Sequence, residues 1–499
     1  MSVRPLGAPP AVRRIALLAV LAALALALGG YGLARADSGL TTRQTSVDGV
    51  PLTEVRATGV TGRRPGVVIA HGFAGSARLM RPIADTVARQ GAVALLLDFA
   101  GHGANPARLP GAGRDAADLR AVLEHDLTVA VGYLRTRPDV DPARIVLVGH
   151  SMGAGAVTRY AAGHPDVART VAISLPDSDD LPDGRPEGLL LIVGGAEFPA
   201  FRETAEATSR RGVGRRLVVV PGFEHISVLF AGRTHDEVAA WVGGGGDPPR
   251  PVARLAPAGL LLLGFGLGFV PLAALLLGRR TRPSRPAAPT PAVLAVAASA
   301  AALGALVGAV APTARLPLAV GGHVTGFLLV TGVLLGAAAR WWPLPAATSP
   351  PAPAPVAHRA PARSAVAAVL LTGYALTAVA VPIHLGLTSA LPVGARWWLL
   401  PVVAAGCLVF LTGAELASAR RSGRYAAVGG IAVLALTASA VVGLAPGFVL
   451  LVVPLFAVLV GWQAAWAAVL RRAGAPRWLP ALVGTALLAW PVATTLPLS

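Results

Sequence analysis

The sequence predicts an α/β domain with a mostly parallel sheet, joined to an all-α, multi-span transmembrane bundle. Between residues 36 and 243, short apolar runs of strand length alternate with amphipathic helical patterns. This alternation is typical of a parallel sheet covered by helices on both faces. From residue 256 to the end the chain is almost continuously apolar, and 54% of all its residues are hydrophobic. Much of the second half is therefore expected to lie in lipid.

The N-terminal segment, residues 1–35, begins with a basic pair, Arg13-Arg14, followed by a long apolar run. This pattern fits either a transmembrane anchor or a signal sequence, and Ala34-Arg35-Ala36 resembles a cleavage site. The length of the apolar run favours a retained anchor. Both interpretations export the domain that follows.

Within residues 36–243, strands are expected at 66–73, 92–103 and 144–150, and again at 170–177, 188–197 and 215–225. Helical patterns lie between or after them, at 76–91, 115–137, 152–164 and 227–244. A tether rich in glycine and proline, residues 244–255, separates this domain from the membrane domain, residues 256–499.

The membrane domain contains eight apolar stretches, each near the ~20 residues that cross a bilayer as a helix. They lie at about 256–278, 291–311, 317–338, 365–386, 397–416, 425–445, 447–469 and 478–496. With the N-terminus inside the cell, sixteen arginines fall in cytoplasmic segments and two, Arg315 and Arg396, in short external loops. This bias predicts a multi-pass plasma-membrane protein whose α/β domain is extracytoplasmic.

Charge and cysteine content exclude several classes of function. The net charge is +18, but residues 35–254 hold 25 arginines against 24 acidic residues, so the excess belongs to the apolar parts. A nucleic-acid partner is therefore not expected, since its contact surface would be a basic patch on a folded domain. The single cysteine, Cys407, excludes a disulfide framework and a cysteine-based metal site. No metal or other cofactor is expected.

Ser151 lies in Gly149-His150-Ser151-Met152-Gly153, which fits the pattern G-x-S-x-G. The pentapeptide stands between a strongly apolar strand and a helix rich in small residues. In that context the two glycines permit a sharp turn, which exposes the serine hydroxyl above the carboxyl edge of the sheet. The surroundings favour a nucleophile over a serine in an ordinary strand-to-helix turn.

Together with four further motifs, this pentapeptide resembles the α/β-hydrolase family over roughly residues 40–243. The nearest groups are the dienelactone hydrolases and the serine-aminopeptidase-like enzymes. The motifs, in family order, are "AHGFAGS" (70–76), "DFAGHG" (98–103), "GHSMG" (149–153), "GGAE" (194–197) and "FEH" (223–225).

The resemblance implies a serine, then an acid, then a histidine as catalytic residues. Ser151 is the expected nucleophile and His225 the expected general base. The acid is Glu197, where relatives usually carry Asp, or alternatively one of a cluster of aspartates, Asp177, Asp179 and Asp180.

An oxyanion hole is also implied by the resemblance. The backbone N–H groups of Met152 and Phe73 are expected to form it.

These observations predict a membrane-anchored serine hydrolase, esterase- or lipase-like, that acts on an ester or lipid-like substrate beside the lipid bilayer. Only about ten residues separate the strands at 170–177 and 188–197, so no helical lid is expected there.

Two other classes of function remain open. A peptidase or acyltransferase could use the same serine, histidine and acid. The chain could also be a transporter or sensor with a ligand-binding domain, because His323, His384 and Glu415 are ionisable groups in or near the spans. The sequence predicts no particular protein partner.

Overall fold

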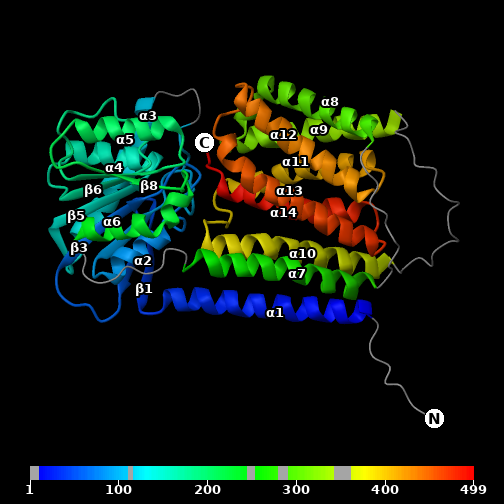
Figure 1. Cartoon of the computed structure of the whole chain (residues 1–499), viewed down its shortest axis with the longest axis horizontal. Helices are drawn as coiled ribbons and strands as arrows, with labels where there is room; N and C mark the ends of the chain where they lie inside the picture. Colours follow the sequence, from blue (N-terminus) through cyan, green and yellow to red (C-terminus); the bar gives the residue numbers. More distant parts are fainter. Residues whose placement is uncertain (1–9, 111–115, 244–252, 279–289, 342–360) are drawn as a thin grey trace, which may run out of the picture. The chain divides into compact units, whose positions relative to one another are not determined.

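The computed structural model describes residues 10–110, 116–243, 253–278, 290–341 and 361–499 (Figure 1). The chain divides into two compact units. The α/β unit comprises Gly29–Gly259, Pro382–Ala395 and Pro497–Ser499, and the helical unit comprises Met1–Leu28, Leu260–Val381 and Arg396–Leu496. The predicted tether at 244–255 lies mostly outside the described residues.

The α/β unit is built on one eight-stranded sheet in the order β1-β2-β4-β3-β5-β6-β7-β8. Strands β3 to β8 are parallel, whereas β1 and β2 form an antiparallel hairpin whose second strand pairs antiparallel with β4. The strands are β1 Leu40–Val47, β2 Val50–Ala57, β3 Arg64–Ala70, β4 Val93–Leu97, β5 Val140–His150, β6 Arg169–Ile173, β7 Leu189–Gly194 and β8 Arg216–Val220.

Helices cover both faces of this sheet, because its central strands are apolar on both sides. In β3, Val67 and Ile69 pack with α2 and α6, whereas Val68 and Ala70 pack with α3 and α4 on the opposite face. A third apolar cluster packs α5 on the later strands. The helices are α2 Arg81–Arg89, α3 Ala116–Arg135, α4 Met152–Gly163, α5 Pro199–Arg210 and α6 Gly232–Val242, with a 3₁₀ turn, η1, at Ser227–Phe230. The α/β architecture with a mostly parallel sheet is thus confirmed.

Three elements of the α/β unit, strands β1 and β2 and helix α5, are not predicted from the sequence. The β1–β2 hairpin turns at Asp48-Gly49, where both residues have positive φ, as a tight two-residue hairpin requires. Helix α5 lies between β7 and β8 in the chain, where the sequence predicts no helix. The expected strands at 66–73 and 92–103 also end earlier, at Ala70 and Leu97, and loops follow them.

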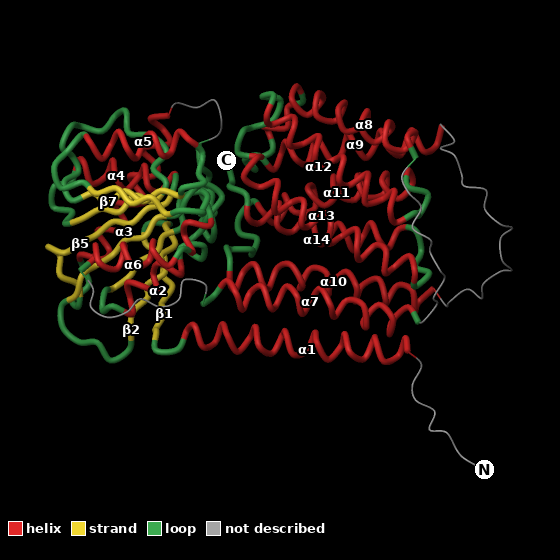
Figure 2. The backbone as a smooth tube through the Cα atoms, in the orientation of Figure 1, coloured by secondary structure: helices red, strands yellow, loops and turns green. Residues whose placement is uncertain are grey.

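The helical unit consists of long apolar helices, which Figure 2 shows in red. Together with α1 (Pro10–Asp37), nine helices in the described part of the chain are long and apolar enough to cross a membrane. The eight later ones are α7 Leu255–Leu277, α8 Pro291–Val310, α9 Gly321–Trp341, α10 Pro361–Gly386, α11 Arg396–Ala417, α12 Ser422–Val441, α13 Val449–Arg472 and α14 Trp478–Thr495. The eight expected spans thus appear as helices, with small differences at their ends.

One buried ion pair links two helices of this unit. The Arg471 guanidinium of α13 donates through Nε to the Glu415 carboxylate of α11 at 3.1 Å, and both side chains are buried. The same guanidinium lies over the Tyr425 ring of α12, with Cζ 4.1 Å from the ring centroid. Glu415, an ionisable group that the sequence analysis left open as a transport residue, therefore has a structural partner.

Candidate active site

Ser151 forms the sharp turn between β5, which ends at His150, and α4, which begins at Met152. Its backbone has φ 53° and ψ −120°, a strained conformation for a residue with a Cβ. Gly149 and Gly153 allow this turn, because they have no Cβ and the backbone can pack closely against them. A Cβ on Gly149 would overlap the Gly153 carbonyl, and a Cβ on Gly153 would overlap the carbonyl oxygens of Ala70 and His71.

His225 lies on the loop after β8 and faces Ser151. Its Nε2 is 3.0 Å from Ser151 Oγ, and its Nδ1 is hydrogen-bonded to Glu197 Oε1. Both His225 and Glu197 are buried. One imidazole therefore connects a serine hydroxyl to a carboxylate, which is the arrangement that activates a serine.

Glu197 is held by groups from two neighbouring strands. Its second oxygen, Oε2, accepts hydrogen bonds from Ser174 Oγ at 2.9 Å and from the Gly194 N–H at 3.1 Å. Ser174 follows β6 directly, has a φ of 56° and is fully buried. Sequence reasoning missed Ser174, since a lone serine at a strand end carries no signal by itself.

The alternative acids lie elsewhere. Asp177 and Asp180 form ion pairs with Arg159 of α4, and Asp179 is exposed. The structure thus brings Ser151, His225 and Glu197 together and leaves the aspartate cluster outside this arrangement.

The loop after β3 passes directly beside Ser151. A Cβ on Gly72 would lie 3.0 Å from the Cβ of Ser151, so this loop can approach the nucleophile closely only with glycine at that position. Phe73 is the second residue of a turn that the Gly75 N–H closes on the Gly72 carbonyl at 2.9 Å, and Ala74, the third, has a φ of 57°. On the other side, Met152 is the first residue of α4, where backbone N–H groups have no partner within the helix.

Two buried histidines support these loops in the neutral form. His71 accepts the Phe99 N–H through Nε2 at 3.1 Å, so its Nδ1 donates to the Gly72 carbonyl at 2.8 Å. Burial lowers the pKa of His71. His150 bonds the His225 carbonyl through Nε2 at 2.9 Å, and burial together with the nearby His225 lowers its pKa to about 3.

Asp98 holds the loop after β4. Its two carboxylate oxygens accept the N–H groups of Ala77 at 2.7 Å and Ala104 at 2.9 Å. These bonds connect the loop after β3 to the loop after β4.

Two segments distant in sequence also bind these loops within the α/β unit. Ser76 Oγ lies 2.8 Å from Thr388 Oγ1 and accepts the Ser389 N–H at 3.0 Å. Leu498 pairs through its backbone with Gly101 and Leu109. The connection between α10 and α11 and the last residues of the chain thus support the rim of the candidate site.

Chemically, the site offers a hydroxyl, an imidazole, a carboxylate and backbone donors. Among the described residues, no group of three or more His, Cys, Asp or Glu side chains is arranged to hold a metal ion. The side chains that meet at Ser151 are those of nucleophilic and general-base chemistry.

Part of the chain is similar to known protein families. Residues 62–178 match the model of the family described as "Serine aminopeptidase, S33". A thermostable monoacylglycerol lipase of Bacillus sp. (strain H-257) is 31% identical over 144 residues, which is 28% of this chain and 49% of that protein. The quorum-quenching protein AidA of Acinetobacter baumannii is 30% identical over 123 residues, 24% of this chain and 36% of that protein.

An uncharacterised protein of Mycobacterium tuberculosis is 36% identical over 107 residues, 21% of this chain and 35% of that protein. The chain thus spans between a third and a half of the length of these curated relatives. Among solved structures, Est1E from Butyrivibrio proteoclasticus matches 40% of this chain and 96% of its own, with 16% identity and a TM-score of 0.31. The α/β unit of this chain is therefore an α/β-hydrolase-like domain, similar over residues 62–178 to the serine-aminopeptidase family, and a region of apolar helices follows it in the chain.

Proposed function

We propose that the protein is a membrane-anchored serine hydrolase that cleaves carboxylic esters through an acyl-enzyme on Ser151. The observation that carries this proposal is the continuous chain of contacts from Ser151 Oγ through His225 to Glu197. In this arrangement His225 is the general base, and Glu197 holds its imidazole in the tautomer with a proton on Nδ1.

The reaction follows from these contacts. Ser151 Oγ attacks the ester carbonyl carbon while His225 Nε2 takes the hydroxyl proton. The tetrahedral intermediate collapses, the C–O bond to the alcohol breaks, and His225 returns the proton to the departing alkoxide. Water then attacks the acyl-enzyme with His225 as base, which releases the carboxylic acid and restores the serine.

The negative charge on the carbonyl oxygen needs donors while the tetrahedral species exists. The N–H groups of Met152 and Phe73 fill this role, because one follows Ser151 and the other lies on the loop that packs against it. One such donor typically lowers the barrier by roughly 3–4 kcal/mol.

An ester is favoured as substrate by the relative named a monoacylglycerol lipase and by the short connection between β6 and β7. Residues 174–188 make this connection without a helix or strand, so no helical lid covers the site from there. The description of the matching family as serine aminopeptidases favours a second candidate, the hydrolysis of an N-terminal peptide bond by the same residues.

The arginine distribution supports a location of the hydrolase domain outside the cytoplasm, as part of a multi-pass plasma-membrane protein. Sixteen arginines fall at one set of span ends and two at the other, which is the bias of the positive-inside rule. The domain then works beside the outer bilayer surface, where esters of lipids and other hydrophobic esters gather.

A fluorophosphonate probe tests the proposal, because it labels only an activated serine. The full-length protein in detergent is expected to label, and the Ser151→Ala variant is not. Hydrolysis of p-nitrophenyl esters from acetyl to dodecanoyl, compared with aminoacyl p-nitroanilides, separates the esterase from the aminopeptidase. If the wild-type protein were not labelled, the enzyme proposal would be wrong and the domain would be a ligand-binding domain.

A further inference from the structure

A cavity in the α/β unit is lined by none of the residues that meet at Ser151. Its volume is about 430 Å³, within the range of small-molecule sites. Gln44, Thr53 and Leu96 form one wall, since they are register partners across β1, β2 and β4 and share one face of the sheet. Apolar side chains from the ends of two membrane-length helices, Leu33 of α1 and Leu385 of α10, contribute to the lining.

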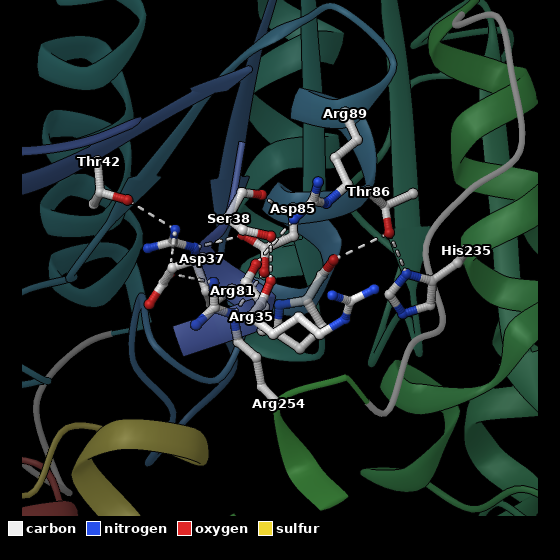
Figure 3. Close-up of polar contacts among 12 residues, drawn as sticks. Arg35, Asp37, Ser38, Thr42, Arg81, Asp85, Thr86, Arg89, His235 and Arg254 are labelled. Carbon is white, nitrogen blue, oxygen red and sulfur yellow. Dashed lines mark hydrogen bonds and ion pairs between the residues drawn. The ribbon is translucent and has the colours of Figure 1, made fainter. Parts of the chain in front are cut away.

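The cavity is also lined by three arginines and one acid: Arg78, Arg81, Arg254 and Asp37. Two of the arginines are already neutralised. Arg81 donates to Asp85 at 2.6 Å and also contacts Asp37, and Arg254 donates to both of these carboxylates at 2.6 Å (Figure 3). This cluster therefore balances two cations with two anions.

Arg78 is the surplus cation. None of the described residues gives its guanidinium a hydrogen bond or an ion pair. Two carboxylates act on it without a direct contact: Asp98, which is already committed to two backbone N–H groups, and Asp37, which pairs with Arg81 and Arg254. Burial lowers the pKa of Arg78, whereas at Arg254 the nearby acids outweigh burial and raise the pKa. A half-buried guanidinium without a direct ion-pair partner is a group that an anionic ligand would stabilise.

The other residues that line the cavity indicate which further groups the ligand carries. Gln44 and Thr53 offer polar groups beside the arginines, whereas Leu33, Leu40 and Leu385 offer an aliphatic surface. We propose that this cavity binds an anionic amphiphile whose carboxylate or phosphate head pairs with Arg78 and whose aliphatic chain lies along the leucines. Such a ligand could be a free acyl anion or the head and upper chain of an acidic membrane lipid.

Binding of radiolabelled dodecanoate to the full-length Ser151→Ala protein in phosphatidylcholine nanodiscs tests this site without turnover. Saturable binding is expected, with competition by dodecyl phosphate but not by inorganic phosphate or dodecyltrimethylammonium. Arg78→Gln should weaken the binding by about tenfold or more, as the loss of a charge-assisted contact does. The matched control is Arg202→Gln on α5, an exposed arginine for which the structure records no ion pair, and it should bind as the parent does.

Replacing part of the phosphatidylcholine by phosphatidylglycerol separates the two sources of the ligand. Competition by the acidic lipid would assign the site to a membrane lipid, and its absence to a free acyl anion; both outcomes support the site. Dodecanoate binding that is equal in Arg78→Gln and the parent overturns the proposal, since that binding does not depend on the Arg78 guanidinium. Absence of saturable binding also overturns it. The result is independent of the esterase proposal, because no catalysis is measured.

Discussion

Ser174 donates its hydroxyl hydrogen to Oε2 of Glu197 at 2.9 Å, while the other oxygen of the same carboxylate bonds His225. The carboxylate is therefore held from two sides. The contact joins the end of β6 to the loop after β7, two neighbouring parallel strands whose carboxyl ends meet at the same edge of the sheet. This arrangement makes Ser174 a positioning residue for the proposed catalytic acid.

Replacement of Ser174 by alanine should reduce kcat of ester hydrolysis by about tenfold with little change in KM, because it removes a hydrogen bond to a charged group without touching substrate. Steady-state kinetics with a p-nitrophenyl ester measure both constants. Ser209→Ala, which removes an exposed hydroxyl on α5, serves as control. Unchanged kcat in Ser174→Ala would refute the positioning role.

The identity of the acid leads to a second prediction. Glu197→Gln should lower kcat by about 100-fold or more, since the amide no longer stabilises the imidazolium form of His225. Asp177→Asn and Asp180→Asn should stay within about threefold of the parent, because their carboxylates pair with Arg159. A larger loss in either aspartate variant than in Glu197→Gln would move the acid to the cluster.

The features of the fold and the site that could be predicted from the sequence are those marked by a pattern of neighbouring residues. The elbow at Ser151 follows from two glycines between an apolar strand and a small-residue helix, and the apolar spans follow from their length. The hairpin of β1 and β2 has a weaker signal, since β1 is largely polar and exposed at the sheet edge. The contacts of Ser76 with Thr388 and Ser389 join residues more than 300 positions apart, and no local pattern could indicate them.

The sharp turn at Ser151, between β5 and α4, leads to a third prediction, which concerns stability. Gly153→Ala should destabilise the hydrolase domain by about 3 kcal/mol or prevent its folding, because the new methyl group meets backbone carbonyls that cannot move aside. Gly132→Ala in α3 is the matched control. A Cβ there meets nothing within 4 Å, so the domain should be unchanged or gain up to about 1 kcal/mol from helix propensity. Thermal unfolding of both variants checks the pair, and equal unfolding temperatures would contradict the packing argument.

The fourth prediction concerns the pH dependence of stability. Burial and the nearby His225 lower the pKa of His150 to about 3 from an ordinary value of 6.5. Below pH 6.5 the unfolded chain binds a proton that the folded protein does not, so this histidine costs stability as the pH falls. His150→Gln retains an N–H donor for the His225 carbonyl and removes the titration.

The free energy of unfolding of His150→Gln, relative to the parent, should therefore rise as the pH drops from 7 to 5. The limit is about 1.4 kcal/mol per pH unit, and no trend is expected above pH 7. Thermal unfolding across this range measures the difference. Parallel curves for the two proteins would show that His150 titrates alike in the folded and unfolded chains.

The ion pair of Glu415 and Arg471 gives the last prediction, for the helical unit. Glu415→Gln should destabilise the protein by about 3–5 kcal/mol, because the Arg471 guanidinium stays buried without its carboxylate. The double variant Glu415→Gln/Arg471→Met removes both charges and should recover most of this loss. Arg472→Gln, at the exposed neighbouring position, should leave the unfolding temperature unchanged. If the double variant were no more stable than Glu415→Gln alone, the carboxylate would have a role beyond neutralising Arg471, and a transport or sensing function at Glu415 would gain support.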